Sequence, residues 1–309
     1  MILSKFKSLR DLEKAFSDEQ SCINYLEKVI WNNNPVSPFD PTSKVYKCAN
    51  NRYKCKNTGK YFNIKSGTIF KNSKLSLREW FRTLYLFSVS KKGISTYQLT
   101  DYVDITQKST WFVLQRLRRD ADCFTFKTTL EGVVEIDETF IGGKNKNRHW
   151  NKKVPNSQGR GSCKDKIPVW GAIERGGNLI AQVVPNTKLS MLEQIINANV
   201  ENGSTVYTDE WYRHSNLSQN FKHQWVNHSA KPKQYANGKI STNTIESAWV
   251  TPKRSVYGIY HNISRKHAQR YVDEFTFRYN TRKYSVQDRF DLMLSSTVGK
   301  QMTYQQLIS

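Results

Sequence analysis

The chain has 309 residues, of which 38% are hydrophobic and 13% aromatic, so it can build a folded core and a wholly disordered protein is excluded. Its 48 Lys and Arg residues exceed its 26 Asp and Glu residues, which gives a formal net charge of +22. Such an excess favours a polyanionic partner such as nucleic acid, the alternative being an ordinary basic surface. No run of residues approaches the roughly 18–20 apolar residues of a membrane span.

The amino terminus lacks the basic-then-apolar layout of a secretory signal. The five cysteines are an odd number, sparse and irregularly spaced, which fits a reducing compartment better than a disulfide framework. We therefore expect a cytoplasmic protein.

The first 72 residues predict two small modules. Apolar positions at helical spacing in residues 8–30 predict two short amphipathic helices within a helical segment at 1–35. A small ribbon-like β module is expected at 36–72. Its strands are predicted at Lys44–Cys48, Arg52–Lys56 and Lys60–Lys65.

A structural zinc ion is not expected in this module. A zinc ribbon needs four soft ligands in two close pairs. Cys48 and Cys55 form no CxxC pair and have no His nearby. We interpret both thiols as ordinary buried side chains.

Residues 73–130 predict a helix-turn-helix DNA-binding domain. Helical periodicity places the helices at Leu75–Ser88, Ser95–Tyr102 and Thr106–Arg119, with a short turn around Val103-Asp104-Ile105. The first turn of the second helix of such a motif reads base edges. The side chains expected to project there are Gln107, Lys108, Ser109 and Thr110. Those expected to meet phosphates are Arg116, Arg118 and Arg119. The alternative is an ordinary helical hairpin with surface charge.

A dense basic cluster lies in residues 144–166, where Gly, Asn and Pro residues indicate a long loop. We expect it either to be a solvated linker or to become ordered on DNA. Its candidate DNA-binding residues are Lys144, Lys146, Arg148, Lys152 and Lys153.

From residue 131 to residue 290 the pattern becomes that of an α+β domain, and residues 291–309 are expected to be a tail. Strands are predicted at Val133–Ile141, Val169–Glu174, Leu179–Pro185, Ser204–Asp209 and Gln224–His228. Helices are predicted at Leu189–Val200 and at Asn243–Arg254, the second opened by Ser241-Thr242 as its cap. This is the element order of a ribonuclease H-like fold, a mixed sheet with flanking helices.

Three acids fall at chemically suggestive places in that order. Asp137 lies inside the first strand, Asp209 ends the fourth and Glu246 lies on the late helix. A carboxylate in an apolar strand is costly to bury unless it is paired or binds a metal. Three converging oxygen ligands suit Mg²⁺ or Mn²⁺, and two such ions about 3.5–4 Å apart support phosphodiester chemistry. The alternative is that the acids are solvent-facing caps and turn residues.

Several long motifs resemble the ISXO-like transposases of bacterial insertion sequences. The resemblance covers nearly the whole chain and implies a DDE-type polynucleotidyl transferase with a ribonuclease H-like core. The segments that carry it are Ser66-Gly-Thr-Ile-Phe70, Trp80-Phe81, Val134-Glu-Ile-Asp-Glu-Thr-Phe-Ile-Gly-Gly143, Gly203-Ser-Thr-Val-Tyr-Thr-Asp-Glu-Trp211, Val226-Asn-His-Ser229, Thr242-Asn-Thr-Ile-Glu-Ser-Ala-Trp249, Gly258-Ile-Tyr-His-Asn-Ile-Ser264 and Tyr271-Val-Asp-Glu-Phe-Thr-Phe-Arg-Tyr-Asn280.

The resemblance implies roles for five residues. Asp137 and Asp209 match the first two metal-binding acids of the family. Glu246, followed seven residues later by Lys253, resembles the glutamate-then-lysine signature of DDE enzymes. Asn243 lies one helical turn earlier on the same face and is the second choice for the third ligand. Glu246 is favoured because a carboxylate binds Mg²⁺ more strongly than an amide, and Lys253 is expected to hold a phosphate.

One departure concerns the amino-terminal module. Where many relatives carry two CxxC pairs, this chain has Ser37-Pro-Phe-Asp40 and Cys55-Lys-Asn-Thr58, so only Cys55 remains of four ligands. The resemblance implies the fold of this module without its zinc.

The sequence therefore predicts a DNA transposase that binds terminal inverted repeats, cleaves strands with Mg²⁺ or Mn²⁺ and joins the exposed 3′-hydroxyl to target DNA. It is expected to act as a homodimer or higher multimer on DNA, associated with the nucleoid. A catalytically silent, domesticated DNA-binding protein and a general nuclease of the same fold are the alternatives.

Overall fold

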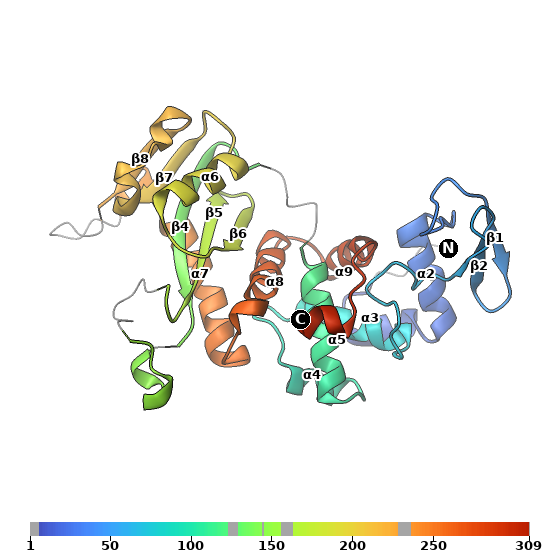
Figure 1. The fold of residues 1–309 in the computed structure, drawn as a ribbon. Helices are drawn as coiled ribbons and strands as arrows, with labels where there is room; N and C mark the ends of the chain where they lie inside the picture. Colours follow the sequence, from blue (N-terminus) through green and yellow to red (C-terminus); the bar gives the residue numbers. More distant parts are fainter. Residues whose placement is uncertain (1–5, 123–128, 144, 156–162, 228–235, 309) are drawn as a thin grey trace. The chain divides into compact units, whose positions relative to one another are not determined.

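The computed structural model describes residues 6–122, 129–143, 145–155, 163–227 and 236–308. The chain divides into two compact units, one made of Met1–Cys123 with Lys283–Ser309 and the other of Phe124–Arg282 (Figure 1). The sequence placed a boundary at residue 290 and a tail at 291–309. That prediction is wrong, because the segment from Lys283 onward belongs to the amino-terminal unit. No described helix combines the length and the apolar character needed to cross a membrane.

Aromatic packing explains why the end of the chain belongs to the amino-terminal unit. Phe290 is fully buried, and its ring centroid lies 5.3 Å from that of Phe81, which is itself 4.9 Å from that of Phe16. These edge-to-face contacts join three helices that are distant in sequence. The helices of this unit are α1 (Leu9–Ala15), α2 (Glu19–Trp31), α3 (Leu77–Val89), α4 (Thr96–Tyr102), α5 (Gln107–Asp120), α9 (Val286–Ser296) and α10 (Tyr304–Ile308).

The predicted ribbon forms a three-stranded antiparallel sheet of β1 (Val45–Cys48), β2 (Arg52–Cys55) and β3 (Tyr61–Phe62). The third strand is shorter than predicted. Tyr53, Cys55 and Phe62 form its small buried core, against which Trp31 packs. This neighbouring helix provides the support that so small a sheet needs.

Three of the four positions that match the family's metal ligands lie together: Ser37 and Thr58 form hydrogen bonds with the Cys55 thiol. Burial alone would raise the pKa of that thiol, but hydrogen bonds with Ser37, Ser43 and Thr58 outweigh it and lower the pKa to about 6. Asp40 accepts a hydrogen bond of 2.7 Å from the Asn57 side chain instead. A polar network therefore occupies this corner of the ribbon.

The second unit is built on a five-stranded mixed sheet with the order β6-β5-β4-β7-β8, which is consistent with the predicted ribonuclease H-like fold. The strands β4, β5 and β6 pair antiparallel, whereas β4, β7 and β8 pair parallel. Strand β8 begins and ends two residues earlier than predicted. The strands are β4 (Val133–Ile141), β5 (Ile167–Glu174), β6 (Leu179–Val183), β7 (Thr205–Asp209) and β8 (Lys222–Val226), with a separate hairpin of β9 (Ala236–Asn237) and β10 (Ile240–Ser241).

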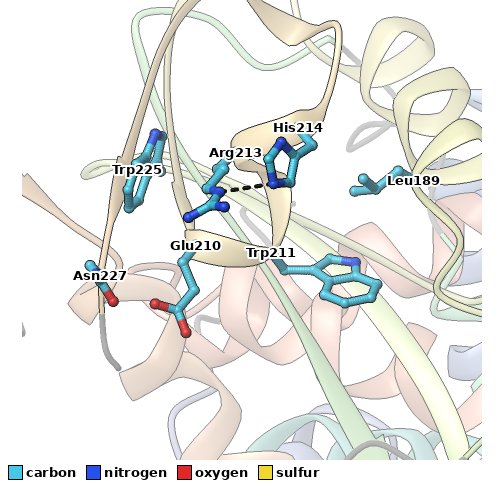
Figure 2. Close-up of a pocket in the computed structure, with 7 residues that line it drawn as sticks. All are labelled: Leu189, Glu210, Trp211, Arg213, His214, Trp225 and Asn227. Carbon is cyan, nitrogen blue, oxygen red and sulfur yellow. Dashed lines mark hydrogen bonds between the residues drawn. The ribbon is translucent and has the colours of Figure 1, made fainter. Parts of the chain in front are cut away.

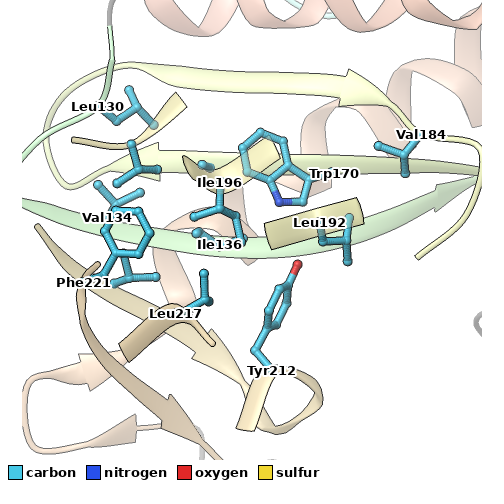
Figure 3. Close-up of a cluster of buried hydrophobic side chains, with 13 residues drawn as sticks. Leu130, Val134, Ile136, Trp170, Val184, Leu192, Ile196, Tyr212, Leu217 and Phe221 are labelled. Carbon is cyan, nitrogen blue, oxygen red and sulfur yellow. The ribbon is translucent and has the colours of Figure 1, made fainter. Parts of the chain in front are cut away.

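Helices cover both faces of this sheet. Helix α6 (Leu189–Asn199) packs on one face through a buried cluster that includes Ile136, Trp170 and Leu192 (Figure 3). Helices α7 (Asn243–Ser255) and α8 (Ala268–Asn280) pack on the other face. Because side chains alternate along a strand, each β4 residue faces either α6 or α7.

Candidate active site

Asp137 and Asp209 lie on neighbouring parallel strands and face the same side of the sheet. Ile136 packs in the cluster on the α6 face, so Asp137 faces α7. In the parallel register Glu135 pairs with Tyr207. Two residues further along each strand come Asp137 and Asp209, which the period of two keeps on that same face.

Glu135 is a fully buried carboxylate that caps helix α7 from the neighbouring strand. Its Oε2 accepts hydrogen bonds from the backbone N–H groups of Thr244 (2.8 Å) and Ile245 (3.1 Å). Its Oε1 accepts from the Thr244 hydroxyl at 2.9 Å. A negative charge at a helix N-terminus is stabilising. The sequence predicted that Ser241-Thr242 caps the helix. Thr242 makes no side-chain cap hydrogen bond, and Glu135 caps the helix instead.

Arg175 completes this cap. Its Nε lies 2.6 Å from Glu135 Oε1, while its other nitrogens donate to the Lys239 and Ser241 carbonyls and its guanidinium lies over the Tyr207 ring. The pair ties β4, the β5–β6 turn and the β10–α7 connection together. Sequence reasoning missed both residues. The available signal was a second acid two residues before Asp137, on the same strand face.

A glycine lets α7 approach the sheet beside Asp137. Gly171 pairs directly with Asp137 across β4 and β5. A Cβ atom at Gly171 would lie 2.5 Å from the Trp249 ring of α7. Only glycine permits this contact between helix and strand. The closeness of α7 to the acids therefore depends on residues at both its end and its middle.

Helix α7 carries the other candidate residues on its exposed surface. Asn243, Glu246 and Lys253 are all exposed. The Thr242 hydroxyl donates a 3.0 Å hydrogen bond to Glu246 Oε1, which orients that carboxylate toward the start of the helix.

The electrostatics link these residues to the strand acids. Burial, together with the charges of Asp209 and Glu246, raises the pKa of Asp137 to about 7, while Lys253 opposes the rise. The structure therefore brings the other two predicted acids and the predicted lysine within electrostatic reach of Asp137. Within the described residues, Asn243 forms no hydrogen bond or ion pair with these acids or with Lys253.

A second acidic group lies on the opposite face of the sheet. Glu138 accepts a short hydrogen bond from the Tyr212 hydroxyl, and burial raises the pKa of Glu138 to about 8. The charges of Asp137 and Asp209 contribute to that rise. Sequence reasoning missed this pair, because the approach of Tyr212 depends on the turn after β7.

No group of three or more His, Cys, Asp or Glu side chains among the described residues is gathered closely enough to hold a metal ion. In the part of the chain that the structure describes, Asp137, Asp209 and Glu246 therefore do not form a preformed three-ligand cluster. Their chemistry is still that of hard oxygen donors, which suits Mg²⁺ or Mn²⁺.

The predicted base-reading helix is α5, joined to α4 by a four-residue connection. Gln107, Lys108, Ser109 and Arg119 are exposed, as the prediction requires. DNA binding by them stays a prediction.

Three other residues of this helix do not fit their predicted roles. Thr110 is buried and bonds with Thr100, and Arg118 is only 1% exposed. Arg116 is 3% exposed and donates to the carbonyls of Ile69, Lys71 and Met302. The structure does not present these three side chains to solvent, because the packing of the fold encloses them.

The basic loop is described in part. Lys146, Lys152 and Lys153 are exposed, and Arg148 donates to the Asp165 carbonyl at 2.9 Å. Two short 3₁₀ turns, Asn145–Asn147 and Trp150–Lys152, interrupt the predicted irregular loop. Lys144 lies outside the described residues, as do the carboxy-terminal part of the loop at 156–162 and His228.

Comparison with known proteins agrees with this architecture. Residues 129–280 match the family of ISXO2-like transposase domains. The chain is also 28% identical over 262 residues to an uncharacterized protein in transposable element ISH50 of Halobacterium salinarum. That match covers 79% of this chain and 87% of the relative.

Proposed function

Because residues 129–280 match the ISXO2-like transposase domain family, we propose that the protein is a DDE-type transposase that cleaves the ends of its own element and joins them to target DNA. Its substrates would be the terminal inverted repeats and a target duplex. The proposal adds the reaction, the metal and the residues to a family membership that gives only the class.

One observation carries the proposal. Asp137 and Asp209 lie on neighbouring parallel strands next to a helix that carries Glu246, and the charges of Asp209 and Glu246 raise the pKa of Asp137. Like charges that act on one another in this way favour a cation between them. Oxygen ligands on strand ends and a helix match the donor preference of Mg²⁺ and Mn²⁺.

Asp137, Asp209 and Glu246 would hold the metal, with Asn243 as the second choice for the third position. When bound, the metal would activate a water or 3′-hydroxyl and stabilise the leaving oxygen of the phosphodiester. Glu135 and Arg175 would hold α7 in the position that brings Glu246 close to Asp137 and Asp209. Lys253 would hold a phosphate near the bond to be cut, because its ammonium lies within reach of Asp137.

The DNA would be held by exposed polar and basic side chains outside the acid site. Candidate contacts are Gln107, Lys108, Ser109 and Arg119 on α5, and Lys146, Lys152 and Lys153 in the basic loop. Arg148 and Lys144 are further candidates of the same loop. A homodimer or larger multimer would bring two element ends together, and the ribbon is proposed to need no zinc.

A cleavage assay tests this function. The full chain is incubated with duplexes that end in the inverted repeats flanking its gene, with and without Mg²⁺. We expect metal-dependent nicks that leave a 3′-hydroxyl at the element end, followed by joining to a second duplex. Binding without nicking would favour a silent DNA-binding protein, and hydrolysis without joining would favour a nuclease.

A further inference from the structure

A cavity of about 420 Å³ opens at the turn that follows β7, beside the end of β8 (Figure 2). Ligand crevices of α/β sheets form outside the carboxyl ends of parallel strands. Trp211 and Glu210 line it from the turn after β7, and Trp225 and Asn227 line it from the end of β8. This volume is in the range of small-molecule sites.

The two indole rings of the cavity are accessible to solvent. Trp211 is 54% exposed and Trp225 is 39% exposed. Trp80, Trp170 and Trp249 are buried, and the more exposed Trp150 lies in the basic loop, outside the cavity. Exposed aromatic surface gathered around one hollow marks a binding site more often than chance. Figure 2 shows the two indoles on different elements, with Arg213 and His214 drawn between them.

The lining favours a flat aromatic ligand with a polar edge. Indole faces stack with aromatic rings, and a guanidinium plane does the same. The Asn227 side-chain amide lines the same cavity. A phosphate fits less well, because the Glu210 carboxylate lines the same cavity and Arg213 already donates to His214 at 2.9 Å. A nucleobase meets these conditions.

The cavity is coupled to the acid site through the backbone. The Asp209 carboxylate accepts a 3.0 Å hydrogen bond from the Trp211 backbone N–H and caps the turn that follows. A base stacked on Trp211 would therefore fix the position of its own strand relative to Asp209. In the proposed reaction, the strand that is cut stays bound at Asp137 and Asp209 during both cleavage and joining. A base bound in the cavity would therefore belong to that strand.

We propose that this cavity receives an unstacked base of the element-end strand, next to the phosphodiester bond that is cut. The inference rests on the proposed function. Stacking on an aromatic side chain holds a base of any sequence, so the pocket would set the position of the strand rather than read its sequence.

An abasic scan combined with Trp211→Ala tests the proposal. Binding to element-end duplexes is measured in the Asp137→Asn background, so that no strand is cut. We expect Trp211→Ala to weaken binding about 5- to 100-fold, the effect of one lost base–aromatic stack. One abasic position beside the cut site should weaken binding equally, and the two changes together should weaken it no further.

Matched variants separate stacking from a general loss of surface. Trp211→Phe should retain most of the binding. Tyr257→Ala, which removes an aromatic side chain that is 88% exposed outside the cavity, should retain both binding and the abasic effect. A target duplex without inverted repeats should show no position-specific abasic effect.

The outcomes are distinct. Additive losses at every position, or no loss with Trp211→Ala, would overturn the base pocket while leaving the transposase function intact. An abasic effect only on the target duplex would overturn the assignment to the element-end strand. Failure of every variant and of the wild-type chain to bind element ends would contradict the proposed function itself.

Discussion

At the scale of single residues, the site depends on carboxylates whose surroundings change their chemistry. Asp137 is held with a pKa near 7 by burial and by the charges of Asp209 and Glu246. Its ionised form is therefore stabilised only when positive charge is close, from Lys253 or from a bound cation. The same surroundings that make Asp137 costly as a structural residue make it suitable as a ligand.

The third ligand can be decided between two residues on one helix face. Glu246→Gln removes a charge that raises the pKa of Asp137. Asn243→Ala removes an exposed amide that does not contribute to that shift. We expect Glu246→Gln to slow metal-dependent nicking about 100-fold or more, because the loss of a charged ligand removes several kcal/mol of stabilisation. Asn243→Ala should have a much smaller effect. A larger loss from Asn243→Ala in the same nicking assay would reverse this assignment.

Asp120 gives a prediction about pH and stability. This fully buried residue accepts a 2.8 Å hydrogen bond from the Ser296 hydroxyl. Burial raises its pKa to about 7, partly offset by Lys300 and Ser296. Because the folded-state pKa lies above the unfolded value of about 3.9, the folded protein binds the extra proton. Stability should fall as the pH rises from about 4 to about 7 and then level off.

Asp120→Asn should remove this part of the pH dependence. As the pH rises from about 4 to about 7, the unfolding midpoint of the variant should rise relative to that of the wild type. Asp104→Asn, a change of an exposed aspartate in the same unit, is the control and should leave the pH dependence unchanged. Equal pH profiles for the wild type and Asp120→Asn would show that burial does not control this proton.

At the scale of elements, the position of α7 is set by contacts that come from other strands. Glu135 caps its first turn, Arg175 holds the connection before it, and Gly171 admits Trp249 at its middle. None of these contacts follows from the sequence of the helix itself.

Glu135→Gln tests the cap. The substitution retains the shape of the side chain but removes the charge that pairs with Arg175 and favours the helix N-terminus. We expect a loss of about 2 kcal/mol or more in the free energy of unfolding, since hydrogen bonds to charged groups are worth roughly 1.5–3 kcal/mol each. Denaturant unfolding followed by tryptophan fluorescence measures it. Glu201→Gln, a change of an exposed glutamate in the same unit, should cost little, and an equal loss from both would refute the cap.

The elements also show how far sequence patterns reach. Periodicity predicted every strand of the large sheet and the helices α3 to α7, because each pattern is local. It did not predict that Arg116 and Arg118 of α5 are buried, because their surroundings come from distant segments. It also did not predict α9, whose Phe290 joins the core of the amino-terminal unit. The strand acids Asp137 and Asp209 could be predicted because acids stand out in apolar strands. Glu135 and Tyr212 could not, since their roles depend on partners brought together by the fold.

At the scale of the whole molecule, the charge of +22 acquires particular locations. Arg116 and Arg118 are buried. The positive charge that faces DNA must therefore come from the exposed cations of α5, the basic loop and the remaining surface. Each cation that contacts a phosphate releases counterions when DNA binds, which makes the affinity depend on salt.

Arg119 offers a direct measure of this. Arg119→Gln should weaken duplex binding at all sequences and reduce the slope of log affinity against log salt by about 1. Titrations over a range of salt concentrations give the slope. Lys14→Gln, a change of an exposed lysine on α1, should leave it unchanged. An unchanged slope for Arg119→Gln would remove Arg119 from the DNA interface.

The central claim is that Asp137 binds a catalytic metal ion, and a change of ligand atom tests it most directly. Thiolates bind Mg²⁺ poorly and accept softer metals more readily. Nicking of element ends by Asp137→Cys is therefore measured in Mg²⁺ and in Mn²⁺, beside the wild type. We predict that the variant is inactive in Mg²⁺ and regains nicking in Mn²⁺, whereas the wild type is active in Mg²⁺. Full activity of the variant in Mg²⁺, or wild-type nicking without any divalent metal, would contradict the account.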